Sequence, residues 1–157
     1  MKVAKRFRWE AAHRLPWHTG GCQNLHGHSY QMWVELEGEP DERGMLVDFH
    51  DIKALLQPLV EAWDHAVLVA ENDHELRQVV QQLGSRFFVL PYDTTSENLC
   101  RYAADYIGRK LAEMPERHRI TRIRIRVQET ETCYGELEVP VSLYLNGTPH
   151  STAHASR

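Results

Sequence analysis

One segment of the chain, residues 25–37, limits the possible folds more than any other. Its even-numbered residues are histidine or apolar, whereas most of the odd-numbered ones are polar. Because side chains alternate across a β-strand, this pattern predicts a strand that buries one of its faces. His26 and His28 continue that buried face, and Gly27 between them adds no bulk. The sequence therefore predicts two imidazoles at the place where the core face of a sheet meets its end.

A third histidine, His13, stands near the end of another predicted strand, residues 2–14. With His26 and His28 it forms a candidate metal site of three nitrogen ligands. Catalytic zinc sites commonly have three protein ligands and leave a fourth position to water or substrate. Zinc is favoured over iron or copper because no carboxylate or thioether completes a different ligand pattern.

Cys22 lies four positions before His26, where a loop containing a glycine pair returns to the strand. Two roles are open to its thiol. As a fourth ligand, it would close a structural metal site. As a free group, it would be a nucleophile or an acid/base beside an open site, and nearby zinc or a protonated histidine would stabilise its thiolate.

Two acidic positions add candidates. Asp64 precedes His65 at the end of a predicted helix, where a carboxylate can orient an imidazole; the alternative is a simple charge pair at the helix end. Glu129 shares its parity with Val127 and so lies on an apolar side, where a carboxylate needs a partner. That partner is either an internal cation or a ligand with two parallel N–H donors, such as a pterin or guanine edge.

Strand and helix patterns alternate along the rest of the chain. Asp48 can cap one helix, Gly84 can stop another, and Thr94 with Glu97 three residues later predicts a capping box that opens a third. Strands are predicted at residues 2–14, 25–37, 86–90, 120–128 and 138–145, and helices at residues 48–63, 74–83 and 94–111.

Hairpins separated by helices predict an α+β fold, an antiparallel sheet with helices on one face. We expect one domain over residues 1–145 and a flexible polar tail over residues 146–157. The long strands have exposed edges, which a barrel formed by several subunits would cover.

Composition excludes several classes of protein. The net charge of −4 argues against a general nucleic-acid surface, and no apolar run is long enough to span a membrane. Arg122, Arg124 and Arg126 recur at strand spacing, which indicates a solvated or partner-facing strand face. No signal peptide is visible, and three widely spaced cysteines fit a reducing compartment, so a cytoplasmic protein is expected.

Taken together, these motifs resemble the 6-pyruvoyltetrahydropterin synthase family, and most closely its bacterial branch, the 6-carboxytetrahydropterin synthases of queuosine biosynthesis. They follow the family order across nearly the whole chain. The matching motifs are Phe-Arg-Trp-Glu-Ala-Ala-His-Arg-Leu-Pro (7–16), Cys-Gln-Asn-Leu-His-Gly-His-Ser-Tyr (22–30), Val-Asp-Phe (47–49), Trp-Asp-His (63–65), Thr-Ser-Glu-Asn-Leu (95–99) and Val-Gln-Glu-Thr (127–130).

The resemblance implies the tunnelling fold: a four-stranded antiparallel sheet with two helices on one face, in trimeric barrels that stack as a hexamer. It implies active sites between subunits, with zinc held by the three histidines named above. It makes Cys22 a catalytic acid/base group and Asp64 with His65 a second one. Glu129 becomes the anchor of the pterin ring, and Glu97 a further substrate-binding residue.

The implied reaction is a zinc-dependent conversion of 7,8-dihydroneopterin triphosphate to 6-carboxy-5,6,7,8-tetrahydropterin, acetaldehyde and triphosphate. The three-residue spacer between Cys22 and His26 resembles the bacterial branch. The alternatives are 6-pyruvoyltetrahydropterin formation, dihydroneopterin side-chain cleavage, and a non-catalytic zinc-stabilised pterin-binding module. The chain departs from the family in a longer stretch at residues 71–93 and in Thr94, where proline is usual.

Overall fold

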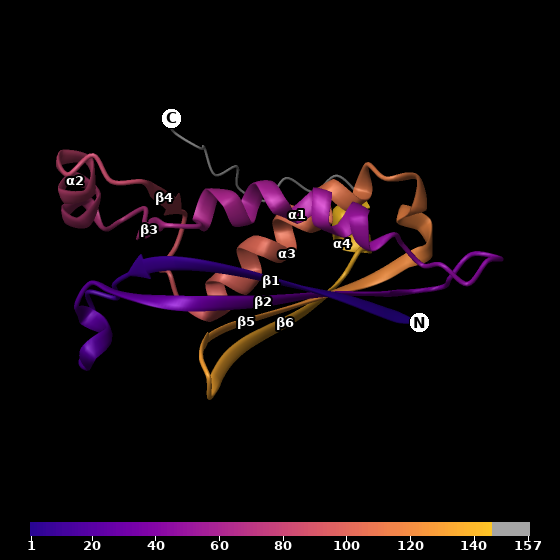
Figure 1. Cartoon of the computed structure of the whole chain (residues 1–157), viewed down its shortest axis with the longest axis horizontal. Coiled ribbons are helices and arrows are strands. Elements are labelled where there is room, and N and C mark those ends of the chain that lie inside the picture. The colour runs from indigo at the N-terminus through magenta and orange to yellow at the C-terminus, as the bar shows by residue number, and fades with distance from the viewer. Residues whose placement is uncertain (146–157) are drawn as a thin grey trace.

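A computed structural model describes residues 1–145. They form a six-stranded sheet in the order β4-β3-β1-β2-β5-β6, with helices α1 and α3 on one side of its four long strands (Figure 1). The strands are β1 (Lys2–His13), β2 (His26–Gly38), β3 (Ala66–Ala70), β4 (Phe87–Leu90), β5 (Ile120–Thr130) and β6 (Cys133–Pro140). The helices are α1 (Phe49–Trp63), α2 (His74–Gln82), α3 (Ser96–Ala112) and α4 (Ser142–Leu145), with short 3₁₀ turns η1 (Gly21–Gln23) and η2 (Pro115–Arg119).

The prediction of a four-stranded antiparallel sheet with two helices is wrong. Strands β1, β2, β5 and β6 are antiparallel, but β3 pairs in parallel with both β1 and β4, so the sheet is mixed. Strand β3 was not predicted, because a five-residue apolar run after a helix carries no alternation that marks a strand. The architecture is α+β, and the predicted flexible tail lies outside the described residues.

The last predicted strand, residues 138–145, is also wrong. Strand β6 begins at Cys133 and pairs antiparallel with β5 across a tight turn, and a short helix follows from Ser142. The alternation of Glu136 and Glu138 with Leu137 and Val139 extends upstream into the hairpin. Pairing with β5 decides where β6 begins, and this pairing cannot be read from the sequence of β6 alone.

Helix termini follow the sequence closely, with one exception. The Asp48 carboxylate accepts a hydrogen bond from the His50 N–H, which confirms the predicted cap of α1. Gly84, at a φ of +65°, follows Leu83, the C-cap of α2, and stops the helix as predicted. Thr95, not Thr94, caps α3 by accepting from the Asn98 N–H, so the predicted capping box is wrong by one residue.

One face of the sheet forms the core with helices α1 and α3. Trp9 stacks on Tyr30 with ring centroids 5.1 Å apart, and Trp63 from α1 packs against Trp9 at 5.2 Å. The fully buried strand residues from β2 and β5 are Tyr30, Met32, Val34, Leu36, Ile123, Ile125 and Val127.

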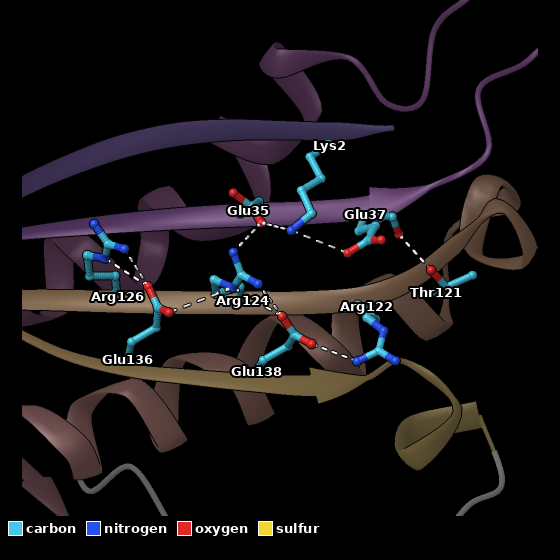
Figure 2. Close-up of polar contacts among 9 residues, drawn as sticks. All are labelled: Lys2, Glu35, Glu37, Thr121, Arg122, Arg124, Arg126, Glu136 and Glu138. Carbon is cyan, nitrogen blue, oxygen red and sulfur yellow. Dashed lines mark hydrogen bonds and ion pairs between the residues drawn. The ribbon is translucent and has the colours of Figure 1, made fainter.

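The opposite face of the sheet is polar, and ion pairs connect its strands (Figure 2). Arg124 on β5 contacts Glu35 on β2 at 3.1 Å and Glu138 on β6 at 2.5 Å. Arg126 pairs with Glu136 at 2.7 Å. The arginine row is therefore a solvent-facing strand surface balanced by glutamates. Among the helices of residues 1–145, none is long and apolar enough to cross a membrane.

Candidate active site

The three predicted histidines meet at the end of the β1–β2 hairpin. The register places His13 opposite His26 and Ala11 opposite His28, so all three imidazoles lie on the core face of the sheet. Their ring centroids are 4.7 to 5.2 Å apart, and their potential ligand atoms lie within 4.8 Å of one another. The strand parity read from the sequence is confirmed.

Backbone carbonyl groups orient two of these rings. His13 Nδ1–H donates to the Thr94 carbonyl oxygen at 2.8 Å, and His26 Nδ1–H donates to the Asn24 carbonyl oxygen at 2.7 Å. These bonds leave Nε2 of each ring with a free lone pair. Nε2 of His13 is buried and has no hydrogen-bond partner within residues 1–145. A second ring nitrogen held by a carbonyl is the usual arrangement of a metal-binding histidine.

The surroundings favour the neutral form of His13 and of His28. Burial lowers the pKa of His13 to about 4, with smaller contributions from His26 and His28, although the bond to Thr94 acts in the opposite direction. Burial and the neighbouring His26 also lower the pKa of His28. A neutral imidazole is the form that binds metal ions. The donor set, its spacing and the orphaned nitrogen of His13 therefore fit a metal ion with three histidine ligands.

A second buried polar group, Glu129, lies beside the histidines. Burial, together with Glu97, raises the pKa of the Glu129 carboxyl group, while His26 and Tyr30 act in the opposite direction. Glu129 Oε1 is buried and has no partner with hydrogen-bond geometry, although the Tyr30 hydroxyl group lies close enough to affect its pKa. No lysine, arginine or histidine of residues 1–145 forms an ion pair with it. This part of the chain therefore does not form the internal salt bridge that was the alternative for Glu129. The carboxylate can accept hydrogen bonds from a ligand instead.

Cys22, like Glu129, lies near the Tyr30 hydroxyl group. It sits in η1, half-buried, and its carbonyl oxygen accepts from the Leu15 N–H at 2.8 Å, which ties the loop to the end of β1. Burial raises the pKa of the Tyr30 hydroxyl, with help from the nearby Glu129 carboxylate and the Cys22 thiol. The cluster of potential metal ligands in the described residues contains the histidines and not Cys22.

Asp64 and His65 lie apart from these groups and contact β1 from its other edge. Asp64 Oδ1 accepts from the Glu10 N–H at 2.9 Å, Asp64 Oδ2 lies 3.0 Å from His65 Nδ1, and the His65 N–H donates to the Glu10 carbonyl oxygen. The hydrogen bonds from Glu10 and His65 lower the pKa of Asp64.

His65 has a φ of +54°, a conformation that costs about 1–2 kcal/mol for a residue with a Cβ. This backbone geometry lets two adjacent side chains pair, and it leaves the imidazole 73% exposed. An oriented, exposed carboxylate–imidazole pair held in a strained conformation is typical of a functional site.

The structure thus brings together most of the predicted site residues but not all of them. His13, His26, His28, Cys22 and Glu129 gather at one end of the sheet, with the exposed Glu97 close to Glu129.

Two buried residues of this site were not predicted to belong to it. Tyr30 has an unpaired buried hydroxyl, and Thr94 was assigned to a helix cap. The parity that Tyr30 shares with His28 was a usable signal for the first. No local pattern reveals the second, because Thr94 contacts His13 across a separation of 81 residues.

Comparison with known proteins agrees with this geometry. The sequence profile of the 6-pyruvoyl tetrahydropterin synthase family matches residues 2–139. The chain is 30% identical over 145 residues to the 6-carboxy-5,6,7,8-tetrahydropterin synthase of Haemophilus influenzae, covering 87% of this chain and 98% of that protein. It is 32% identical over 140 residues to the synthase of the same name from Rickettsia bellii, covering 87% and 99%.

Among solved structures, a 6-pyruvoyltetrahydropterin synthase variant from Plasmodium vivax shares the fold. The TM-score is 0.72 at 15% sequence identity, and the match covers 89% of this chain and 98% of that one. At this identity the likeness concerns the fold alone.

Proposed function

The chain belongs to the 6-pyruvoyl tetrahydropterin synthase family, and from this premise we propose that it is a zinc-dependent lyase acting on 7,8-dihydroneopterin triphosphate. The proposed products are 6-carboxy-5,6,7,8-tetrahydropterin, acetaldehyde and triphosphate, with one water consumed. This is the reaction of the 6-carboxytetrahydropterin synthases of queuosine biosynthesis, and curated relatives at about 30% identity carry that name.

The observation that carries the proposal is the pairing of two unsatisfied groups at one end of the sheet. A three-histidine cluster with an orphaned Nε2 on His13 stands beside a buried carboxylate oxygen of Glu129. Leaving a buried polar group unpaired costs about 1–3 kcal/mol, which a ligand that pairs with it recovers. A metal ion suits the first group, and a heterocycle with adjacent N–H donors suits the second.

Zinc would be held by His13, His26 and His28, with a position left for the substrate. When bound, it would supply Lewis-acid chemistry, lowering the pKa of the side-chain hydroxyl groups of the substrate. The carbonyl groups of Thr94 and Asn24 keep two of the ligand rings oriented before the ion arrives.

Glu129 would bind the pterin ring. An ionised carboxylate accepts two parallel N–H bonds, and such charge-assisted bonds are stronger than neutral ones. Burial makes the ionised form costly, as the raised pKa of Glu129 indicates, and the N–H donors of the ring would replace the lost water. Glu97, in the first turn of α3, would contribute at the rim of the same site.

Cys22 would exchange a proton with the substrate side chain from one side, and His65, oriented by Asp64, from the other. Within one chain Asp64 and His65 contact Glu10 and each other, not the histidine cluster. We therefore propose that His65 acts in the site of a neighbouring subunit, in trimeric barrels stacked as a hexamer. The edge strands β4 and β6 leave backbone groups available for pairing between subunits.

One incubation tests the proposed reaction. Zinc-loaded protein is mixed with 7,8-dihydroneopterin triphosphate, and mass spectrometry identifies the pterin product and any acetaldehyde. We expect the 6-carboxy product together with acetaldehyde. A 6-pyruvoyl product or simple side-chain cleavage would assign another reaction of the family, and unchanged substrate with bound zinc would favour a binding module.

A mixing experiment tests the shared site. Cys22→Ala and His65→Asn are each expected to lose turnover, with Cys133→Ala, at an exposed cysteine, as the control. Dissociating and reassembling the two inactive variants in equal amounts should restore about one quarter of the sites, because random assembly places both intact groups together in that share. No recovery from correctly reassembled oligomers would place both groups in one chain.

A further inference from the structure

The unit β3–α2–β4, residues 66–90, does more than extend the sheet. We propose that this unit, together with Thr94 in the loop that follows it, positions the metal ligand His13: Asp73 holds Arg14, and Thr94 holds the His13 ring. The proposal rests on the proposed function, because it takes the histidine cluster to be a metal site. Neither Asp73 nor Thr94 is a metal ligand; Asp73 acts through the Arg14 side chain, and Thr94 acts through the His13 ring.

His13 needs support because it ends its strand. Strand β3 pairs with β1 only at Ala11 and Ala12, so on that side His13 has no backbone partner. Its one strand neighbour is His26 on β2, itself the first residue of its strand. From this point β3 runs on beside β4, and α2 lies beyond the end of β1 (Figure 1). The unit therefore reaches past the strand end that carries the ligand.

Asp73 holds the residue that follows the ligand. Arg14 donates to Asp73 through two nitrogens, Nε at 2.7 Å and Nη2 at 2.6 Å, in a paired arrangement that fixes the guanidinium plane. The Asp73 side chain is only 5% exposed, so water screens this pair little. The same carboxylate caps α2 by accepting from the Leu76 N–H at 3.1 Å. Arg14 is thus tied to a rigid helix terminus.

Thr94 holds the ligand itself. It is fully buried, and His13 Nδ1 lies 2.8 Å from its carbonyl oxygen and 3.1 Å from its hydroxyl oxygen. The Thr94 hydroxyl group also donates to the Arg14 carbonyl oxygen at 3.5 Å. The loop that carries Thr94 is fixed in turn, since Asn98 Nδ2 donates to the Asp93 carbonyl oxygen at 2.9 Å.

The two contacts therefore hold two adjoining residues, His13 through Thr94 and Arg14 through Asp73. Together they fix the direction in which the His13 imidazole presents its free nitrogen. Replacing an outer partner of a metal ligand typically lowers metal affinity by about 10- to 100-fold. We expect losses in this range from variants that break either contact while the fold remains intact.

Asp73→Asn separates positioning from capping. Asparagine caps helices about as well as aspartate, but it cannot form the charged two-point pair with Arg14. Zinc affinity is measured by competition with a chromogenic chelator on the oligomeric protein. We expect the zinc dissociation constant to rise about 10-fold. Glu75→Gln is the matched control, because Glu75 also contacts Arg14 at 2.7 Å but is 78% exposed, and it should bind zinc as the native chain does.

Two further measurements keep the result interpretable. Cobalt(II) replaces zinc, and its visible absorption reports ligand geometry independently of turnover; the band should change in Asp73→Asn and not in Glu75→Gln. Thr94→Val, which keeps the carbonyl and loses the hydroxyl, should also weaken zinc binding. Arg14→Lys serves as a second test of the Asp73 contact should Asp73→Asn fold poorly.

The outcomes separate this proposal from the proposed function. If the native chain binds zinc and turns over substrate, while Asp73→Asn matches it in zinc affinity and in the cobalt spectrum, Asp73 stabilises the fold only and the positioning role is wrong. A native chain that binds no zinc overturns the proposed function, and this proposal with it.

Discussion

Replacing His13 by asparagine should remove a specific part of the acid sensitivity of the metal-free protein. His13 is 1% exposed, and burial lowers its pKa from the ordinary value of 6.5 to about 4. Between pH 4 and 6.5 the unfolded chain therefore binds a proton that the folded chain does not. The free energy of unfolding must fall as the pH is lowered through this window, and below it both states carry the proton.

The size of the effect follows from the two pKa values. They differ by about 2.5 pH units, and each unit corresponds to about 1.36 kcal/mol, which gives about 3 kcal/mol in total. That is a large part of the stability of an ordinary domain, which is about 5–15 kcal/mol. An asparagine at this position can still donate to the Thr94 carbonyl oxygen, but it does not titrate.

The assay is denaturant unfolding after treatment with a chelator, at a series of pH values from 7.5 to about 4. Over this range the free energy of unfolding of the native chain should fall by about 3 kcal/mol more than that of His13→Asn. Each protein is compared with its own value at pH 7.5, so a constant difference between the two does not matter. His50→Asn removes an exposed imidazole instead and should follow the native curve. Carboxylates that titrate in the same range contribute equally to all three proteins and cancel.

The reasoning is refuted if His13→Asn loses as much stability as the native chain between pH 7.5 and 4. That result would mean that the His13 imidazole takes up its proton in the folded state as readily as in the unfolded one. The site would then be open to water in solution, and His13 would not be held in the neutral form that binds a metal ion.

Three other perturbations have definite expected outcomes. Glu129→Gln should raise the dissociation constant of neopterin, followed by fluorescence, about 10-fold or more because a charge-assisted acceptor is lost, while zinc content stays unchanged. Thr95→Ala should lower the free energy of unfolding by about 1 kcal/mol through loss of the α3 cap, and an unchanged unfolding midpoint would contradict the assignment. Gly38→Ala should cost about 1–3 kcal/mol, because the new Cβ would lie 1.9 Å from the Arg119 carbonyl oxygen, whereas Gly21→Ala, with no atom within 4 Å of the new Cβ, should leave thermal unfolding as it is.

Structural features that depend on residues close together in the sequence could be predicted reliably. The alternation around His26 and His28 predicts the strand and the face of the imidazoles, and Asp48 and Gly84 bound their helices as predicted. In these cases the physical cause is local: side-chain period, a cap, or a backbone conformation that glycine favours. The same reasoning failed for Thr94, whose neighbour His13 is distant in the chain.

The sheet topology could not be predicted from the sequence, for a different reason. Strand β3 is short, shares only two paired positions with β1, and gains its other neighbour from β4 after an intervening helix. Parallel pairing of this kind leaves no alternation in the sequence, because such strands are covered on both faces. The six-stranded mixed sheet therefore became visible only once the elements were assembled.

By itself, the sequence determined the chemistry available to this protein: two imidazoles on one strand face and a third at the end of another strand, a thiol near them, and a carboxylate placed on an apolar side. Side-chain period and residue type are properties of short segments, so they can be read without knowing the fold. Only the tertiary structure decided which of these groups meet, which nitrogen of His13 stays free, and that Asp64 with His65 contacts Glu10 and not the cluster of its own chain. Those outcomes depend on contacts between residues far apart in the chain, and the free energy of packing, not local pattern, selects them.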